Sequence, residues 1–171
     1  MKKGIITIII VIVSTIVYAG PIKVTEGKTN YTKETTSIII KFNWANAQYD
    51  YKMPLRDQLK GDYESYLREG EQKFIKEFCE NSSRLTVVAK ESEAKYCMSI
   101  EVTNMDKYFS AMSFVPGMKY KIWAIITITD LSDQSIKCKF NVKEFVGGRD
   151  FEDSDAFTEC LGGLGKKIAK P

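Results

Sequence analysis

Alternation of apolar and polar residues in two adjacent runs constrains the fold of this chain most strongly. Residues 119–130 and 135–145 are rich in β-branched and aromatic residues, and the polar segment 131–134 separates them. The second run places an apolar residue at every other position, namely at Ile136, Cys138, Phe140 and Val142. This pattern predicts a β-hairpin with one buried face. Such a sheet needs a second layer to cover that face.

Two amphipathic helices are predicted to supply the second layer. After Asp62, a predicted N-cap, apolar residues recur at helical spacing, and the set is Tyr63, Tyr66, Leu67, Gly70, Phe74 and Phe78. A second set follows the acidic stretch 150–155 and comprises Ala156, Phe157, Cys160, Leu161, Leu164 and Ile168. Acidic residues at the start of this helix and lysines at its end suit the helix dipole.

Further strands are predicted at 37–44, 85–89 and 96–103, which gives the order β-α-β-β-β-β-α. We therefore expect an α+β fold. It would be a two-layer sandwich with a mainly antiparallel sheet of about five strands and two amphipathic helices on one face.

The first 19 residues have the three parts of a secretory signal peptide. Lys2 and Lys3 are basic, residues 4–17 are almost entirely apolar, and residues 17–19 offer a small-residue cleavage site. The rival interpretation is an uncleaved membrane anchor, but a spanning helix needs roughly 20 apolar residues and this run is shorter. We expect cleavage after Ala19.

Cleavage would place the mature chain in the periplasm or the extracellular space. No cysteine lies near the cleavage site, so we expect a soluble protein that is not a lipoprotein and keeps no stable membrane span. We expect a flexible segment over 20–36 and a single α+β domain over 37–171. The net charge is +3 and falls to +1 once Lys2 and Lys3 are removed, which argues against a nucleic-acid partner.

The chain contains no histidine. This excludes Ser-His-Asp and Cys-His hydrolases and removes most zinc and copper sites. The acidic residues lack the spacing of a calcium-binding EF-hand, and nothing in the sequence indicates that two carboxyls converge across a cleft as glycoside hydrolysis needs. We therefore interpret the protein as non-enzymatic and expect no catalytic residue, no metal and no cofactor.

Four cysteines are present, at Cys79, Cys97, Cys138 and Cys160. In an oxidising compartment an even count favours disulfides, with three connectivities to choose from. Buried free thiols fit the sequence equally well. If one disulfide links the hairpin to the last helix, we expect it between Cys138 and Cys160, because both fall on predicted inward faces.

The second half of the chain carries four short motifs: A-K-Y at 94–96, I-T-I-T-D at 126–130, G-G-x-D-F at 147–151, and L-G-x-L-G-K-K-I-A-K at 161–170. The pattern resembles a group of small exported bacterial proteins. Their fold is similar to the amino-terminal domain of TolB and to auxiliary components of envelope transporters. The resemblance covers mainly residues 94–170. It implies a fold and an envelope setting, and it transfers no functional residue.

Two segments are candidate binding surfaces. The Met-rich connection 104–118 is a candidate partner-docking loop with residues Met105, Tyr108, Phe109, Met112 and Phe114, although these residues could instead extend the flanking strands. The stretch 44–51 holds three aromatic residues that suit stacking on a sugar or small ligand, although they could equally cover the core: Trp44, Tyr49 and Tyr51.

The sequence therefore favours an exported, non-enzymatic interaction module of the bacterial cell envelope that binds another envelope protein. The alternative is a small-ligand or glycan-binding domain that uses the aromatic residues of 44–51.

Overall fold

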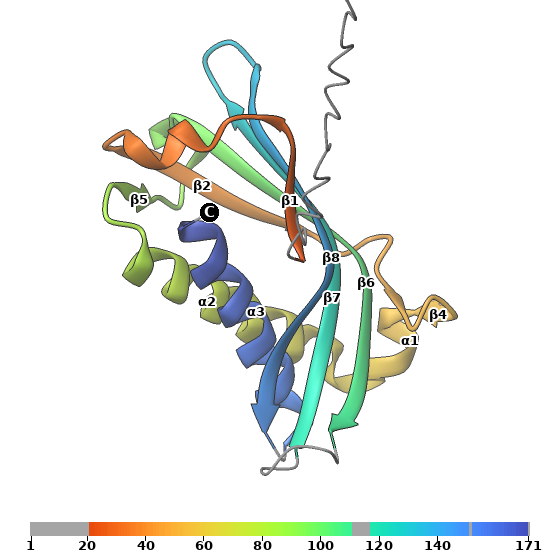
Figure 1. Cartoon of the computed structure of the whole chain (residues 1–171). Coiled ribbons are helices and arrows are strands. Elements are labelled where there is room, and N and C mark those ends of the chain that lie inside the picture. The colour runs from red at the N-terminus through yellow and green to blue at the C-terminus, as the bar shows by residue number, and fades with distance from the viewer. Residues whose placement is uncertain (1–20, 111–116, 151, 171) are drawn as a thin grey trace, which may run out of the picture.

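A curved sheet with helices on one face makes up the protein (Figure 1). The computed structural model describes residues 21–110, 117–150 and 152–170. In chain order the elements are β1 (Ile22–Gly27), the 3-10 helix η1 (Thr29–Lys33), β2 (Thr36–Asn43), β3 (Gln48–Tyr49), β4 (Met53–Pro54), α1 (Leu55–Leu59), η2 (Lys60–Asp62), α2 (Tyr63–Asn81), β5 (Leu85–Val87), η3 (Glu91–Glu93), β6 (Tyr96–Ser110), β7 (Gly117–Asp130), β8 (Ile136–Asp150) and α3 (Asp153–Ala169).

The sheet is mixed. Its described strands form one 8-stranded sheet whose main path runs β1-β8-β7-β6-β2-β5, with β3 attached to β6 and β4 attached to β3. Strands β1, β8, β7 and β6 are antiparallel neighbours. Strand β2 is parallel to both β5 and β6, because α2 carries the chain back between them.

The expected α+β class is confirmed, but the expected count of about five mainly antiparallel strands is too low. The predicted set of strands lacks β1 and the short pair β3–β4. The parallel pairing of β2 with β5 and β6 was not predicted either. Strand β1 lies inside the segment 20–36, for which the sequence predicts flexibility. Ile22 and Val24 of this strand alternate with polar residues, but the run is short and only Ile22 is partly buried. Backbone pairing with β8 holds it instead.

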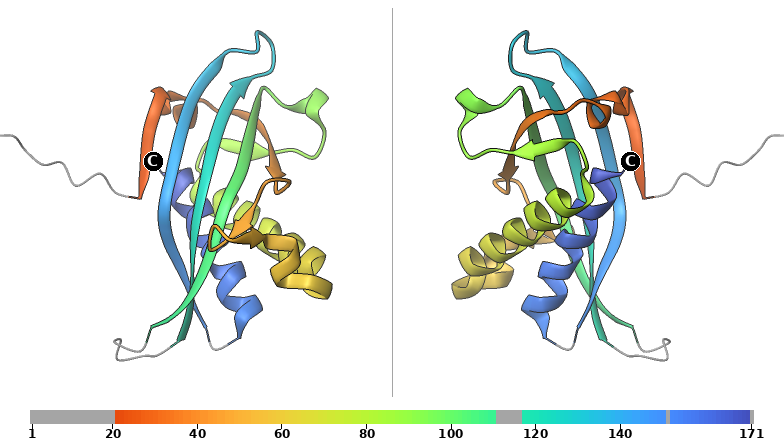
Figure 2. Two further views of the ribbon diagram at one scale, coloured as in Figure 1. Left: turned by 90° about the vertical axis from the view of Figure 1, so that its right-hand side faces the viewer. Right: turned by 90° about the vertical axis from the view of Figure 1, so that its left-hand side faces the viewer.

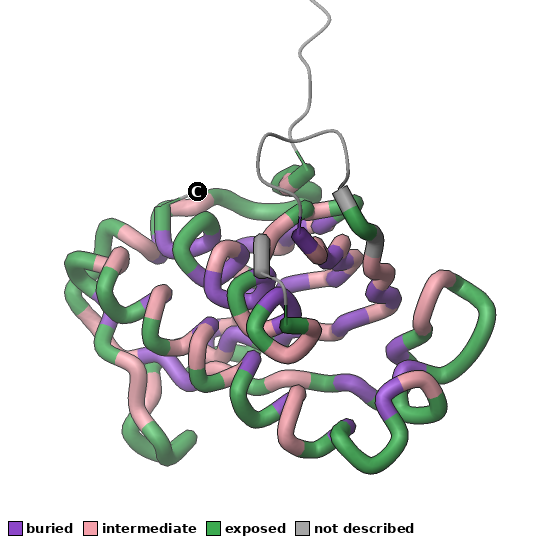
Figure 3. Tube along the Cα trace, turned by 90° about the horizontal axis from the view of Figure 1, so that it is seen from below, coloured by how far each residue is buried: buried purple, intermediate pink, exposed green. Residues whose placement is uncertain are grey.

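Helices α2 and α3 pack side by side on one face of the sheet and leave the opposite face uncovered by helices (Figure 2). Buried and partly buried positions alternate along β7 as the predicted hairpin requires. Seen from below, the tube has its buried residues gathered in the interior and many of its exposed residues in the outer turns (Figure 3). The largest fully buried side chains include Tyr31, Tyr96, Tyr120, Phe74, Phe78, Phe140 and Phe157. We call the uncovered side the outer face of the sheet.

Close contact between α2 and α3 depends on glycine. A Cβ added at Gly165 would lie 2.5 Å from the backbone oxygen of Phe74, well inside van der Waals contact. A Cβ added at Gly70 would lie 2.3 Å from a side-chain carbon of Leu161. The neighbouring Gly163 is different, because its added Cβ would lie 3.5 Å from the ring of Phe145. The two helices therefore approach too closely for a side chain at position 165.

The N-terminal segment closes one end of the molecule. Tyr31 of η1 is 2% exposed, and its hydroxyl donates to the carbonyl of Ile168 at 3.5 Å. The backbone N–H of Lys28 donates to the carbonyl of Lys137 at 3.0 Å. Residues 22–33 are thus tied both to the end of α3 and to the start of β8.

Within the described ranges, each helix is too short or too polar to cross a membrane. The predicted signal peptide at 1–19 lies outside the described residues.

Candidate functional site

The predicted docking loop is mostly strand. Strands β6 and β7 run through residues 96–110 and 117–130, as the strand-extension alternative predicts. Met105 is fully buried in β6 and belongs to the core, whereas Phe109 is 61% exposed. Met112, Phe114 and the side chain of Tyr108 lie outside the described residues.

Trp44 is a core residue and is 9% exposed. Its ring stacks between Phe42 and Phe157 at centroid distances of 5.9 and 6.2 Å. Its indole N–H donates to Glu71 Oε1 at 2.7 Å. Burial raises the pKa of Glu71, and the hydrogen bond from Trp44 opposes that shift. One edge of Trp44 lines a surface pocket of about 400 Å³, which neither Tyr49 nor Tyr51 reaches.

Tyr49 and Tyr51 belong to the β3–β4 hairpin but lie in different environments. Tyr49 is half-buried, and Asp106 and Asp153 add to the effect of burial in raising its pKa. Tyr51 is 60% exposed, and its ring packs edge-on against Trp123 at 5.4 Å. The three aromatic residues of 44–51 therefore do not converge on one site, and Tyr51 pairs with a tryptophan that the sequence analysis did not select.

Trp123 lies on the outer face of β7, where both neighbouring strands carry an irregularity. On one side the register with β6 shifts between Val102 and Asn104, and on the other side the register with β8 shifts between Ile122 and Ala124. Each shift places an extra residue opposite Trp123. β-Bulges re-aim side chains and are common beside functional sites.

Three of the five described non-glycine residues with positive φ lie near Trp123, whereas the other two, Lys60 and Gln134, lie elsewhere. Asp50, Tyr51 and Glu144 have φ values of 50°, 56° and 53°, in the left-handed region that non-glycine residues rarely adopt. Asp50 and Tyr51 form the tight turn of the β3–β4 hairpin, whose Lys52 N–H donates to the Tyr49 carbonyl at 3.0 Å. Strained backbone of this kind persists only where surrounding contacts enforce it, and it clusters at functional sites.

Asn104 connects the strained turn to the bulge. Its side-chain oxygen accepts the backbone N–H of Tyr51 at 2.8 Å, and the Asp50 N–H donates to the Met105 carbonyl at 2.9 Å. Asn104 is fully buried, and within the described chain its amide nitrogen has no hydrogen-bond partner. A buried donor without a partner costs about 1–3 kcal/mol. We call Tyr51, Asn104, Lys121, Trp123 and Glu144 the Trp123 site.

Basic and acidic side chains both surround the Trp123 site: in the strand registers Asp106 lies opposite Lys121, Glu101 opposite Ile125 and Glu26 opposite Lys139. Lys121 pairs with Glu144 at 2.5 Å, and burial together with Glu144 raises the pKa of Tyr51. Farther along the outer face, Lys139 and Lys143 project from β8, and no ion pair is recorded for either among the described residues. The outer face thus combines an exposed tyrosine, a half-buried tryptophan and the side chains of Lys139 and Lys143.

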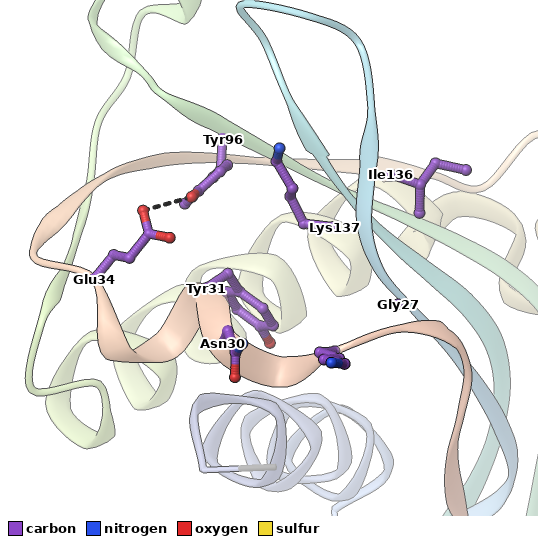
Figure 4. Close-up of a pocket in the computed structure, with 8 residues that line it drawn as sticks. Gly27, Asn30, Tyr31, Glu34, Tyr96, Ile136 and Lys137 are labelled. Atoms are coloured by element: carbon purple, nitrogen blue, oxygen red, sulfur yellow. Dashed lines mark hydrogen bonds between the residues drawn. The ribbon is translucent and has the colours of Figure 1, made fainter.

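A second concave feature lies between η1 and the start of β8 (Figure 4). This η1 pocket has a volume of about 360 Å³, and its lining is Gly27, Lys28, Asn30, Tyr31, Glu34, Tyr96, Ile136 and Lys137. Glu34 Oε2 accepts from the Tyr96 hydroxyl at 2.6 Å and from the Lys95 amine at 2.7 Å. The hydrogen bond from Lys95, and then that from Tyr96, lowers the pKa of Glu34.

The cysteines are free thiols in this structure. A Cβ added at Gly147 would lie 2.8 Å from the Cα of Cys160, and Gly147 is separated from Cys138 by a stretch of β8 about 30 Å long. A disulfide needs Cα atoms within about 7 Å, so the expected bond between Cys138 and Cys160 does not form here. Burial raises the pKa of the Cys160 thiol to about 12.

Two acidic side chains, Asp153 and Asp130, hold parts of the fold together. Asp153, in the first turn of α3, accepts from the Tyr120 hydroxyl at 2.9 Å and the Lys107 amine at 2.8 Å. Asp130 accepts from the backbone N–H of Ser132 at 3.0 Å and from its hydroxyl at 2.6 Å. Across the described residues, no group of three or more Cys, Asp and Glu side chains is placed to hold a metal ion.

Comparisons with known proteins give likenesses of backbone shape only. No protein-family model and no curated protein sequence matches the chain. A PelC dodecamer from Paraburkholderia phytofirmans superposes with a TM-score of 0.46 and 10% identity, covering 85% of this chain and 96% of that chain. A DUF330 protein from Xanthomonas campestris gives 0.37 and 15% identity, with coverage of 80% and 84%. A neuraminyllactose-binding hemagglutinin homologue from Helicobacter pylori gives 0.38 and 8% identity, with coverage of 79% and 82%. Likenesses this weak assign no function to the chain.

Proposed function

We propose that this protein is an exported, non-enzymatic interaction module of the bacterial cell envelope that binds another envelope protein through the Trp123 site. The signal-peptide pattern of residues 1–19 supports export to the periplasm or beyond. The resemblance of residues 94–170 to exported proteins with a TolB-like fold supports the envelope setting.

The observation that carries the proposal is the Tyr51–Trp123 pair on the outer face. Tyr51 is 60% exposed, although tyrosine rings of this size are usually at least half-covered in a folded domain. Tyr and Trp are the residues that most often dominate the energy of protein–protein interfaces. Because β-strands hold the tryptophan and a hydrogen-bonded turn holds the tyrosine, little entropy would be lost on binding.

The charge of the outer face selects the partner chemistry. Lys139 and Lys143 have no ion pair among the described residues, and Lys121 is already paired with Glu144. The complementary surface is a protein that presents an apolar or aromatic side chain next to acidic residues. Such charge complementarity would steer association and make its rate fall with ionic strength.

A glycan or small-ligand role is the second candidate, and one observation favours it. The Tyr51 and Trp123 rings pack edge-on at 5.4 Å, and aromatic rings of this kind suit stacking on a sugar. The site for that role would be the Trp123 site, in place of the aromatic residues of 44–51.

The two candidates are separated by a cross-linking experiment in the native envelope. A photo-reactive amino acid is placed at Tyr51, and a control is placed at Val24, which is 40% exposed on β1. We expect one acidic protein to be cross-linked from position 51 and not from position 24. The purified partner should then bind the wild type but lose affinity for the Lys139→Glu/Lys143→Glu variant.

Binding that ignores Tyr51→Ala and the double charge reversal would refute the proposed docking surface. Retention of a defined oligosaccharide on the wild type, lost in Tyr51→Ala but not in the charge reversal, would favour the glycan role.

Export has its own test. Amino-terminal sequencing of the protein from the envelope fraction should give a chain that begins at Gly20. A chain that still begins at Met1 would contradict cleavage.

A further inference from the structure

The η1 pocket has walls that the fold holds in place. Tyr31 fixes η1 to the core through its buried ring, and the Lys28 N–H fixes the start of η1 to β8. On the opposite side, Tyr96 is 2% exposed and belongs to β6. The cavity of about 360 Å³ therefore lies between elements anchored to the core, and its size is within the range of small-molecule sites.

Two lysines supply hydrogen-bond donors to this pocket. For the Lys28 amine, no ion pair is recorded within the described ranges. The Lys137 amine lies 3.4 Å from Asp130 and 3.6 Å from Asp133, longer than the optimum for an N–H···O bond. Both acidic partners are already held by serine side chains. Lys137 thus keeps donor capacity for a ligand.

The acidic residue of the pocket is already neutralised. Lys95 and Tyr96 both donate to the same oxygen of Glu34, Oε2. Figure 4 shows Glu34 and Tyr96 joined at one end of the pocket, with Lys137 on the β8 side between Tyr96 and Ile136. Lys95 balances Glu34, and Asp130 and Asp133 lie 3.4 and 3.6 Å from the Lys137 amine, so Lys28 is the lysine of the lining for which the described residues show no ion pair.

The rest of the lining is largely apolar. Ile136 is 41% exposed at the rim, and the aromatic rings of Tyr31 and Tyr96 form the wall on the η1 and β6 sides. A ligand that suits this lining has a compact apolar body and one anionic group.

We propose that the η1 pocket is a binding site for a small organic carboxylate, whose anionic group lies between the Lys28 and Lys137 amines and whose apolar body contacts Tyr31 and Ile136. This site is separate from the Trp123 site and does not depend on the proposed function.

Benzoate is the probe, and benzyl alcohol is its neutral counterpart with the same ring. Each is titrated into isotope-labelled mature protein while backbone amide signals are followed by NMR. We expect benzoate to cause saturable shifts at the amides of Gly27, Asn30 and Lys137. Benzyl alcohol should bind about tenfold more weakly or not at all, since a charge-assisted hydrogen bond contributes about a factor of ten in affinity.

Lysine variants locate the anion. Lys28→Gln should weaken benzoate binding about tenfold without disturbing the fold, because its amine has no recorded ion pair among the described residues. Lys137→Gln should do the same, whereas Lys139→Gln, on the same strand but outside the pocket, should bind as the wild type does. The absence of saturable shifts, equal binding of benzyl alcohol, or equal loss in Lys139→Gln would each overturn the proposal.

Discussion

Two glycines two residues apart on α3 should respond in opposite directions to the same substitution. Gly163→Ala adds a methyl group that meets the ring of Phe145 at an ordinary contact distance of 3.5 Å. The substitution removes the helix-interior penalty of glycine, about 1 kcal/mol. We therefore expect Gly163→Ala to raise the free energy of unfolding by about 1 kcal/mol, which is a rise of about 2–4 °C in Tm for a domain of this size.

Gly165→Ala gains the same helix propensity but inserts its methyl group 2.5 Å from the backbone oxygen of Phe74. Overpacking of a core costs about 1–3 kcal/mol, and we take the upper end because a backbone carbonyl cannot rotate away as a side chain can. Subtracting the gain of about 1 kcal/mol leaves a net loss of about 2 kcal/mol, or a fall of about 4–8 °C in Tm.

Urea unfolding followed by far-UV circular dichroism measures both variants on one scale. The m-value should stay constant, so that the midpoint alone reports the change in stability. If Gly165→Ala were as stable as Gly163→Ala, the proposed closeness of α2 and α3 would be refuted. Equal losses in both variants would instead show that glycine is needed at each position for a reason other than this contact.

Three further predictions concern single side chains. Burial raises the pKa of Glu71, so ionisation of this carboxyl costs stability as pH rises through that pKa. The Glu71→Gln variant keeps an acceptor for the Trp44 N–H. In thermal melts, this variant should gain stability relative to wild type as pH is raised from acid to neutral. The pKa of Glu34 is lowered, so its stabilising effect is present at neutral pH and lost as pH falls through that pKa; Glu34→Gln should melt at a lower temperature at neutral pH, and the two melting curves should converge in acid. Phe109→Ser should change stability by no more than about 0.5 kcal/mol because the ring is 61% exposed, whereas Met105→Ala should cost about 2–5 kcal/mol; a large loss for Phe109→Ser would place that ring in the core.

Periodic segments of the sequence predict their elements well. The helical spacing that starts at Tyr63 predicts a helix over 63–80, and α2 spans Tyr63–Asn81. The β7–β8 hairpin and α3 also follow their predicted patterns, because each buries one face against the core and its sequence records that face. The predicted end of the second hairpin strand at residue 145 is wrong, however, because β8 continues to Asp150 through the two glycines at 147 and 148.

The candidate sites were less accessible to sequence analysis. Trp44 follows a strand and looks like a loop aromatic, but it is buried because α2 and α3 fold over it. Trp123 sits at a polar-facing position within an alternating run, and this mismatch is a signal that could have drawn attention to it. The bulges beside it leave no local mark, because register shifts depend on how separate strands align.

The strand order also creates a problem of timing during folding. Strand β1 is among the first described segments to be synthesised, yet its partner is β8, and Ile22 aligns with Val142. The apolar strand β2 likewise waits for β6, where Ile38 aligns with Tyr96. Contacts between such distant residues form late.

A nascent or translocating chain must therefore keep the edge of β2 from pairing with other chains until the β6 segment is available. Stretches such as Ile38-Ile39-Ile40 pair readily with any open strand edge. We expect the isolated β1–α2 portion of the protein to aggregate, and the need for a holding chaperone to end only when the second half of the chain has emerged.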